Sequence, residues 1–142
     1  MIWLLRHAEA EPGSPDEARK LTPKGEEQAR NAGLALARLG VKPDLCLTSP
    51  RVRAVQTAEL ACEPLGVQVT IEPRLSGGPF DPEELAAGVG EVLLVGHDPD
   101  FSMAVHDMTG AQVRLRKGGL AAVNKGELVV LVRPRETTEI AR

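Results

Sequence analysis

Residues 2–7, Ile-Trp-Leu-Leu-Arg-His, form a short apolar run that ends in a guanidinium and an imidazole. The run predicts a strand over residues 2–5, because consecutive apolar residues are typical of a strand buried on both faces of a parallel sheet. Ligands of open α/β sheets bind beyond the carboxyl ends of the strands. The sequence therefore places Arg6 and His7 where a bound ligand would lie.

Two further apolar runs end in side chains of the same kinds. Residues 45–48 lead into Ser49 and then Arg53, while residues 91–95 lead into His97. Parallel strands end at one edge of their sheet, so the three runs would bring two imidazoles and at least two guanidiniums together. These groups predict a site that binds and transfers a phosphoryl group.

Apolar runs alternate with helical patterns along the chain, which is typical of βαβ units around a mostly parallel sheet. We therefore expect an α/β fold, a three-layer α/β/α sandwich, in one domain over residues 1–142. The other predicted strands cover residues 67–71, 120–123 and 128–132, and the last two flank a turn.

Helices are predicted from capping residues and from apolar residues at helical spacing. The expected helices cover residues 23–39, 50–65, 83–87 and 98–109. Thr22 and Ser49 are the expected N-caps of the first two, each followed by a proline at the first helical position. The polar tail from about residue 134 is expected to fray.

The composition narrows the class of protein. A chain of 142 residues can bury one core, and with only 2% aromatic residues that core must consist of aliphatic side chains. The net charge of -3 argues against nucleic acid as the main partner. No stretch approaches the roughly 20 apolar residues of a membrane span, and no signal peptide is expected. We therefore expect a cytoplasmic protein, with Cys46 and Cys62 as buried thiols.

The Arg6–His7 pair suits phosphoryl chemistry through both of its side chains. A neutral imidazole is a competent nucleophile at phosphorus, because its unperturbed pKa is about 6.5. The guanidinium can hold phosphoryl oxygens in a two-pronged hydrogen bond that lysine cannot reproduce.

Four other residues are assigned from their positions. Arg53 lies one turn after Ser49, so it can reach back over the start of the helix, whereas Arg51 is expected to point into solvent. Packing does not explain a histidine at the end of a central strand, so His97 is expected to serve the site. His106, in the middle of a predicted helix, is expected to be structural or exposed.

Four stretches in order resemble the histidine phosphatase superfamily, which has the phosphoglycerate-mutase-like fold. They are LLRHAEA, LTPKGEEQA, TSPRVRAVQTA and LLVGHDPDFS, and they lie within residues 2–102. The short chain, the alanine after the Arg-His pair and the GHDPD sequence look most like the small phosphohistidine phosphatases of the SixA type.

This resemblance implies a phosphatase that works in two steps. His7 would attack phosphorus and become transiently phosphorylated, and water would then release phosphate. Arg6, Arg53 and His97 would bind the phosphoryl oxygens in the transition state, and Ser49 would add a supporting hydrogen bond. Such chemistry needs positioning and charge stabilisation, which these residues can supply without a metal or another cofactor.

The chain departs from the resemblance at the general acid. Larger members of the superfamily carry a carboxylic acid in a region that here reads Leu75-Ser76-Gly77-Gly78-Pro79-Phe80-Asp81. Asp81 is the nearest candidate. The absence of a general acid slows hydrolysis only a little when the leaving group is already good, as in phosphohistidine.

The sequence therefore leaves three functions open. The expected substrate is phosphohistidine on a protein. The alternatives are a small-metabolite phosphomonoesterase with Asp81 as acid, and a phosphate-binding module without turnover. Neither nucleic acid nor a membrane is expected as a partner, and the oligomeric state stays open between a monomer and a weak dimer.

Overall fold

The computed structural model describes all 142 residues, with strands and helices alternating over most of the chain. The strands are β1 (Ile2–Arg6), β2 (Leu45–Thr48), β3 (Val69–Ile71), β4 (Val92–Gly96), β5 (Leu120–Asn124) and β6 (Glu127–Val132). The α-helices are α1 (Pro23–Arg38), α2 (Val52–Cys62), α3 (Pro82–Leu85), α4 (Asp100–Thr109) and α5 (Pro134–Ala141). Three short 3₁₀ helices, η1 (Asp16–Ala18), η2 (Glu63–Leu65) and η3 (Pro73–Leu75), complete the order.

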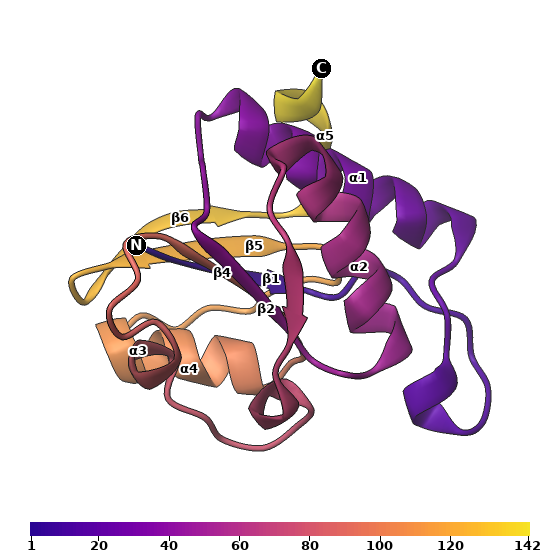
Figure 1. Cartoon of the computed structure of the whole chain (residues 1–142), viewed down its shortest axis with the longest axis horizontal. Coiled ribbons are helices and arrows are strands. Elements are labelled where there is room, and N and C mark those ends of the chain that lie inside the picture. The colour runs from indigo at the N-terminus through magenta and orange to yellow at the C-terminus, as the bar shows by residue number, and fades with distance from the viewer.

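One six-stranded sheet crosses the molecule in the order β3-β2-β4-β1-β5-β6 (Figure 1). The first four strands in that order are parallel to one another, and β5 and β6 form an antiparallel hairpin beside β1. The predicted α/β fold with a mostly parallel sheet is confirmed.

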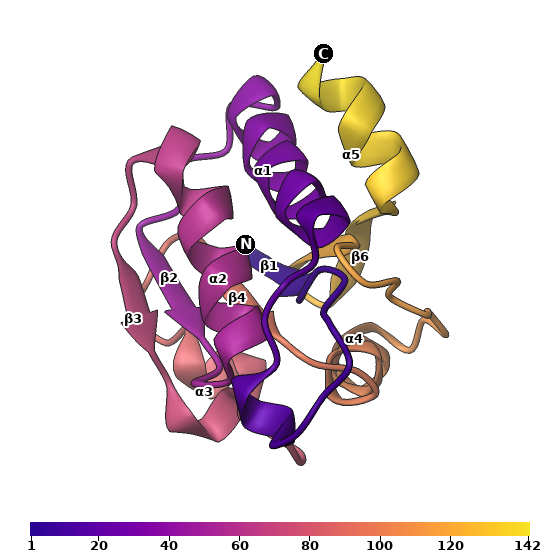
Figure 2. The same cartoon turned by 90° about the vertical axis from the view of Figure 1, so that its right-hand side faces the viewer.

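Helices cover both faces of the sheet (Figures 1 and 2). Side chains of β1 alternate between two cores, as the strand period of two requires. Leu5 packs with Ala32 and Ala58 of α1 and α2, while Leu4 packs with Phe101 of α4. Both cores are almost entirely aliphatic, in keeping with the composition.

The expected start of the second helix is wrong. α2 begins at Val52 rather than Pro50, and Ser49 is not its N-cap. Arg51 occupies that position with an extended backbone (φ -64°, ψ 137°) and no side-chain cap. The hydroxyl of Ser49 accepts a hydrogen bond from the Arg51 backbone at 3.2 Å, one turn before the helix, and also contacts His97.

The expectation that the chain frays from about residue 134 is also wrong. α5 lies along α1 (Figure 2), and Thr137 is fully buried. Asn31 of α1 donates a side-chain hydrogen bond to the Thr138 hydroxyl at 3.3 Å. The tail is polar in composition, but it forms a helix with one face against the protein.

Candidate active site

The register of β1 and β4 brings the two histidines together. Arg6 is paired with Gly96 across these parallel strands, so His7 and His97 are each the first residue beyond the paired ends. The His7 backbone donates to the Gly96 carbonyl at 2.9 Å, and the two ring centroids lie 5.2 Å apart. Both side chains are buried. The strand ends therefore meet as the sequence predicts.

Gly96 is required where β4 packs against α4. A Cβ atom at this position would lie 2.7 Å from the ring of Phe101, closer than any real contact. The missing side chain lets the aromatic ring fill the space beneath the turn that presents His97.

Ser49 reaches the same place from the neighbouring strand β2. Its backbone donates to Val95 of β4 at 3.0 Å, and its hydroxyl lies 2.7 Å from His97 Nε2. Ser49 is fully buried, so this contact is not shared with solvent. The hydroxyl therefore restrains the orientation of the His97 ring.

The hydrogen bond at His7 Nδ1 defines the tautomer of the ring. Nδ1 lies 2.8 Å from the carbonyl oxygen of Ala8. Because a carbonyl oxygen only accepts, Nδ1 must carry the hydrogen, and Nε2 of the neutral ring keeps a free lone pair.

A threonine of α2 anchors the residue that holds His7. The Thr57 hydroxyl accepts from the Ala8 backbone at 3.0 Å and donates to the Arg53 carbonyl at 2.7 Å. Thr57 is fully buried. One hydroxyl thus links the segment of His7 to the helix turn that carries Arg53.

Both histidines are held in the neutral form. Burial lowers the pKa of His7 to about 3, with further lowering by His97, Arg53 and Arg6, while its bond to Ala8 opposes the shift. Burial, and then the charge of Arg53, lowers the pKa of His97 to about 4. At neutral pH the two imidazoles are therefore uncharged and lie among guanidiniums.

Arg6 and Arg53 are fixed by backbone carbonyls. Arg6 donates to the Leu115 carbonyl at 2.9 Å, and Arg53 donates to that of Asp16 at 2.9 Å. The Nε groups of both arginines are buried without a protein partner. Each guanidinium is therefore oriented by the protein and retains hydrogen-bonding capacity.

Arg51 does not point away into solvent as expected. Its Nε donates to the Ser76 carbonyl at 2.8 Å, and its terminal nitrogen pairs with the Asp16 carboxylate. The helical geometry used for the expectation does not apply, because Arg51 precedes α2 in extended conformation. Asp16, in η1 of the connection after β1, also pairs with Arg53 at 3.2 Å.

These side chains surround a cavity of about 340 Å³. Its lining residues are Arg6, His7, Arg19, Arg51, Arg53, Ser76, Gly77, His97, Asp98, Asp100 and Lys117. Five of them are cations and two are carboxylates, so the cavity is positively charged in a protein whose net charge is negative. Such a cavity selects an anion.

Asp81 lies outside this cavity. It is the N-cap of α3, and its carboxylate accepts from the backbones of Glu83 and Glu84 at 3.0 and 3.4 Å. The carboxylates inside the cavity have partners of their own. Asp98 binds the hydroxyl and backbone of Ser102, and Asp100 accepts from the Gly78 backbone.

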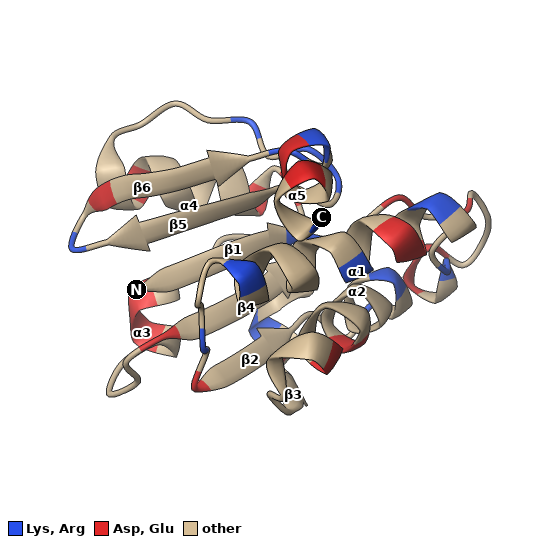
Figure 3. Ribbon diagram, turned by 90° about the horizontal axis from the view of Figure 1, so that it is seen from above, with Lys and Arg blue, Asp and Glu red and all other residues tan.

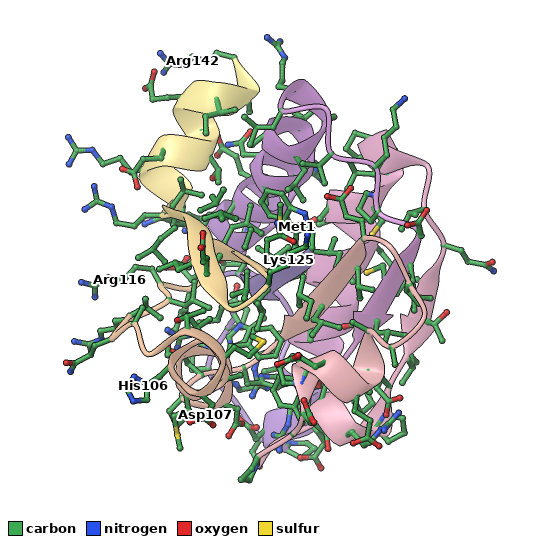
Figure 4. The ribbon with its side chains drawn as sticks, turned by 90° about the vertical axis from the view of Figure 1, so that its left-hand side faces the viewer. Met1, His106, Asp107, Arg116, Lys125 and Arg142 are labelled. Atoms are coloured by element: carbon green, nitrogen blue, oxygen red, sulfur yellow. The ribbon has the colours of Figure 1, made fainter.

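Two residues of the cavity, and the carboxylate that pairs with arginines lining it, have no clear signal in the sequence. Asp16, Arg19 and Lys117 lie in connections whose paths no periodicity predicts. Thr57 falls within the quoted TSPRVRAVQTA stretch, four positions after Arg53, and that spacing on one helix face could have identified it. His106, in contrast, is exposed on α4 (Figure 4) and does not line the cavity.

The structure has neither a metal-binding cluster nor a membrane-spanning helix. No group of three or more His, Cys, Asp or Glu side chains is arranged to hold a metal ion. None of the helices has the length and apolar character needed to span a membrane.

The protein has an α/β fold with a cationic cavity at the strand ends, and comparison with known proteins gives the family. Residues 2–80 match the histidine phosphatase superfamily (branch 1). An uncharacterized protein of Picosynechococcus sp. is 34% identical over 141 residues, covering 88% of this chain and 85% of the relative. The chain belongs to the histidine phosphatase superfamily.

Solved structures of SixA proteins share this fold. The protein histidine phosphatase SixA complexed with tungstate has a TM-score of 0.82 and 22% identity, covering 95% of this chain and 97% of the other. A SixA protein from Agrobacterium tumefaciens has a TM-score of 0.81 and 25% identity, covering 94% and 97%. The mouse mitochondrial serine/threonine-protein phosphatase PGAM5 matches only in part: 39% identity over 85 residues covers 58% of this chain and 30% of the mouse protein.

Proposed function

We propose that this protein is a metal-independent phosphatase in which His7 is the nucleophile. The observation that carries the proposal is the hydrogen bond from His7 Nδ1 to Ala8, which leaves Nε2 unprotonated on a residue lining a cationic cavity. The low pKa of His7 keeps that lone pair available over the whole neutral range.

The reaction has two displacements at phosphorus. In the first, Nε2 of His7 forms a bond to phosphorus while the leaving group departs with its electron pair and takes up a proton from solvent. In the second, water attacks phosphorus, the P–Nε2 bond breaks, and the proton of water is released. Arg6, Arg53 and His97 stabilise the charge on the three equatorial oxygens, and Ser49 orients His97.

We propose phosphohistidine on a protein as the substrate. The two carboxylates of the cavity are hydrogen-bonded to their own neighbours, and Asp81 caps α3, so the site offers no obvious strong acid. A P–N bond to imidazole breaks without strong acid assistance, whereas an alkyl phosphate needs a proton on the leaving oxygen. The likeness of the fold to SixA proteins agrees with this choice.

A turnover comparison tests this proposal. The purified protein is assayed for phosphate release from a phosphohistidine peptide, a phosphoserine peptide and a sugar phosphate, with Asp81→Asn beside the wild type. We expect the phosphohistidine peptide to be hydrolysed about 10²-fold or more faster than the alkyl phosphates, with little effect of Asp81→Asn.

Two other outcomes would replace the proposal. Fast hydrolysis of the sugar phosphate that collapses in Asp81→Asn would assign a small-metabolite phosphomonoesterase. Binding of phosphate without release from any of the three substrates would leave a non-catalytic module.

A further inference from the structure

The connection between α4 and β5 carries three exposed cations beside the cavity. They are Arg114, Arg116 and Lys117, and Lys117 also lines the cavity. Figure 3 shows the blue Lys and Arg positions on the connection that leads into β5, and Figure 4 shows Arg116 projecting outward from it.

Hydrogen bonds connect the backbone of this segment to β1, to His7 and to α4. The Leu115 carbonyl accepts from Arg6 at 2.9 Å, and the Leu115 backbone donates to the Ser102 hydroxyl at 3.0 Å. Gly118 donates to the carbonyl of His7 at 3.0 Å. Leu115 is buried while its two neighbours are exposed, so the cations are presented by a fixed piece of backbone.

None of the three cations has an ion-pair partner. The salt bridges of the protein involve other arginines, and no carboxylate lies within 4 Å of Arg114, Arg116 or Lys117. Together with Arg6 they concentrate positive charge in a protein of net charge -3. The pKa of Arg6 is lowered, and burial is the largest cause. The charge of Asp98 opposes this lowering, whereas the charges of Arg114 and Arg116 add to it. Clustered like charges cost free energy that an anionic partner would offset.

Arg114 and Arg116 do not line the cavity, so the phosphoryl group itself is not their partner. A small phosphate ester seated in about 340 Å³ would leave them in solvent, whereas a protein surface around a phosphorylated residue extends beyond the cavity. We propose that Arg114, Arg116 and Lys117 form a docking strip for carboxylates that flank the phosphorylated residue of an acidic protein substrate. This rests on the proposed function and names its substrate class more closely.

The test measures binding separately from turnover. Two phosphohistidine peptides, identical except for flanking Glu or Gln residues, are titrated against His7→Ala by fluorescence anisotropy. The same titrations are made in this background with Arg114→Gln/Arg116→Gln, and with Arg38→Gln/Lys125→Gln as a control. The control removes the same charge from exposed, unpaired cations, Lys125 lying in the β5–β6 turn at the opposite end of β1 (Figure 4).

We expect the Glu-flanked peptide to bind about ten-fold more tightly at low ionic strength. The preference should vanish in Arg114→Gln/Arg116→Gln, persist in the control, and disappear at about 1 M salt, where the Debye length is only about 3 Å. With His7 restored, Arg114→Gln/Arg116→Gln should hydrolyse p-nitrophenyl phosphate at the wild-type rate.

Equal binding of the two peptides, or a preference that survives Arg114→Gln/Arg116→Gln, would overturn the docking strip. The docking strip would also be overturned if a small bisphosphate bound through these arginines while the two peptides bound with equal affinity. If the wild type hydrolysed neither peptide, the proposed function would fail, while the binding comparison would still decide on the strip.

Discussion

At the scale of single residues, the two arginines at the start of α2 differ in burial but share Asp16. Arg53 is 7% exposed and donates to both the backbone and the carboxylate of Asp16, whereas Arg51 is half-buried and bridges Asp16 to Ser76. Both guanidiniums use more than one nitrogen, which a lysine cannot do.

We therefore expect Arg53→Lys to lower kcat by about 10²-fold and Arg51→Lys by about ten-fold. The sequence alone predicts Arg51→Lys to be nearly silent, and the position of Arg51 in the cavity replaces that prediction. Steady-state kinetics on an aryl phosphate checks both, with the exposed Arg30→Lys as control. An Arg53→Lys protein with wild-type kcat would show that the two-pronged hydrogen bonding of the Arg53 guanidinium is not needed.

Thr57 is a positioning residue, because it acts on His7 through Ala8. Thr57→Val keeps the volume but removes the hydroxyl, which frees the Ala8 segment and leaves the buried Ala8 N–H unpaired. We expect kcat to fall about ten-fold with a smaller change in KM, and Thr57→Ser to restore it. If Thr57→Val lowered only the melting temperature, or Thr57→Ser failed to rescue kcat, the hydroxyl would be purely structural.

At the scale of elements, the close approach of α1 and α2 sets where Arg53 and Thr57 lie. Gly33 of α1 packs against the backbone of Ala61, and a Cβ at Gly33 would overlap the Ala61 carbonyl oxygen. The small residues Ala32, Ala58 and Ala61 line the same contact. A side chain at Gly33 would therefore push α2 away from α1.

Gly33→Ala should destabilise the protein by about 1–3 kcal/mol, although alanine favours helix by about 1 kcal/mol, because the backbone of Ala61 cannot yield cheaply. Urea unfolding followed by circular dichroism measures this, with Leu34→Ala on the exposed side of α1 as control. A Gly33→Ala protein as stable as the wild type would show that the helices can separate freely.

Much of this arrangement is predictable because it depends on local patterns. The apolar runs ending at Arg6, Thr48 and His97 identify the parallel strands, and their common edge identifies the site. A turn at 124–126 predicts the hairpin of β5 and β6.

The remainder depends on contacts that no local pattern encodes. Asp16 lies in an irregular connection that brings it to the arginines. Arg51 points toward the cavity because its backbone, just before α2, is extended and not helical. α5 is stabilised by packing on α1, although its sequence is polar. Each of these features becomes visible only when distant segments are placed together.

At the scale of the whole molecule, the two buried histidines couple stability to pH. Their pKa values are lowered to about 3 and 4 in the folded protein, while the unfolded chain takes up protons near pH 6.5. The stability that the two neutral histidines allow is thus fully present above about pH 6.5, and it declines as the pH falls toward 4.

Between pH 7 and pH 5 we expect each histidine to remove roughly 1–2 kcal/mol from the free energy of unfolding. Urea titrations at the two pH values measure the loss, and the double variant His7→Gln/His97→Gln should lose that much less stability over the same interval. An unchanged pH dependence in the double variant would mean that the two imidazoles titrate normally in the folded protein.

The chemical identity of the phosphoenzyme decides whether His7 is the nucleophile. Wild-type protein mixed with a phosphohistidine peptide or an aryl phosphate is quenched in alkali, digested, and analysed by mass spectrometry and ³¹P NMR. Because Nδ1 of His7 is bonded to Ala8, phosphate should be found on Nε2 of His7 and be absent from His7→Ala, which should be inactive. Turnover without a phosphoenzyme, or phosphate on Nδ1 or on His97, would contradict the account.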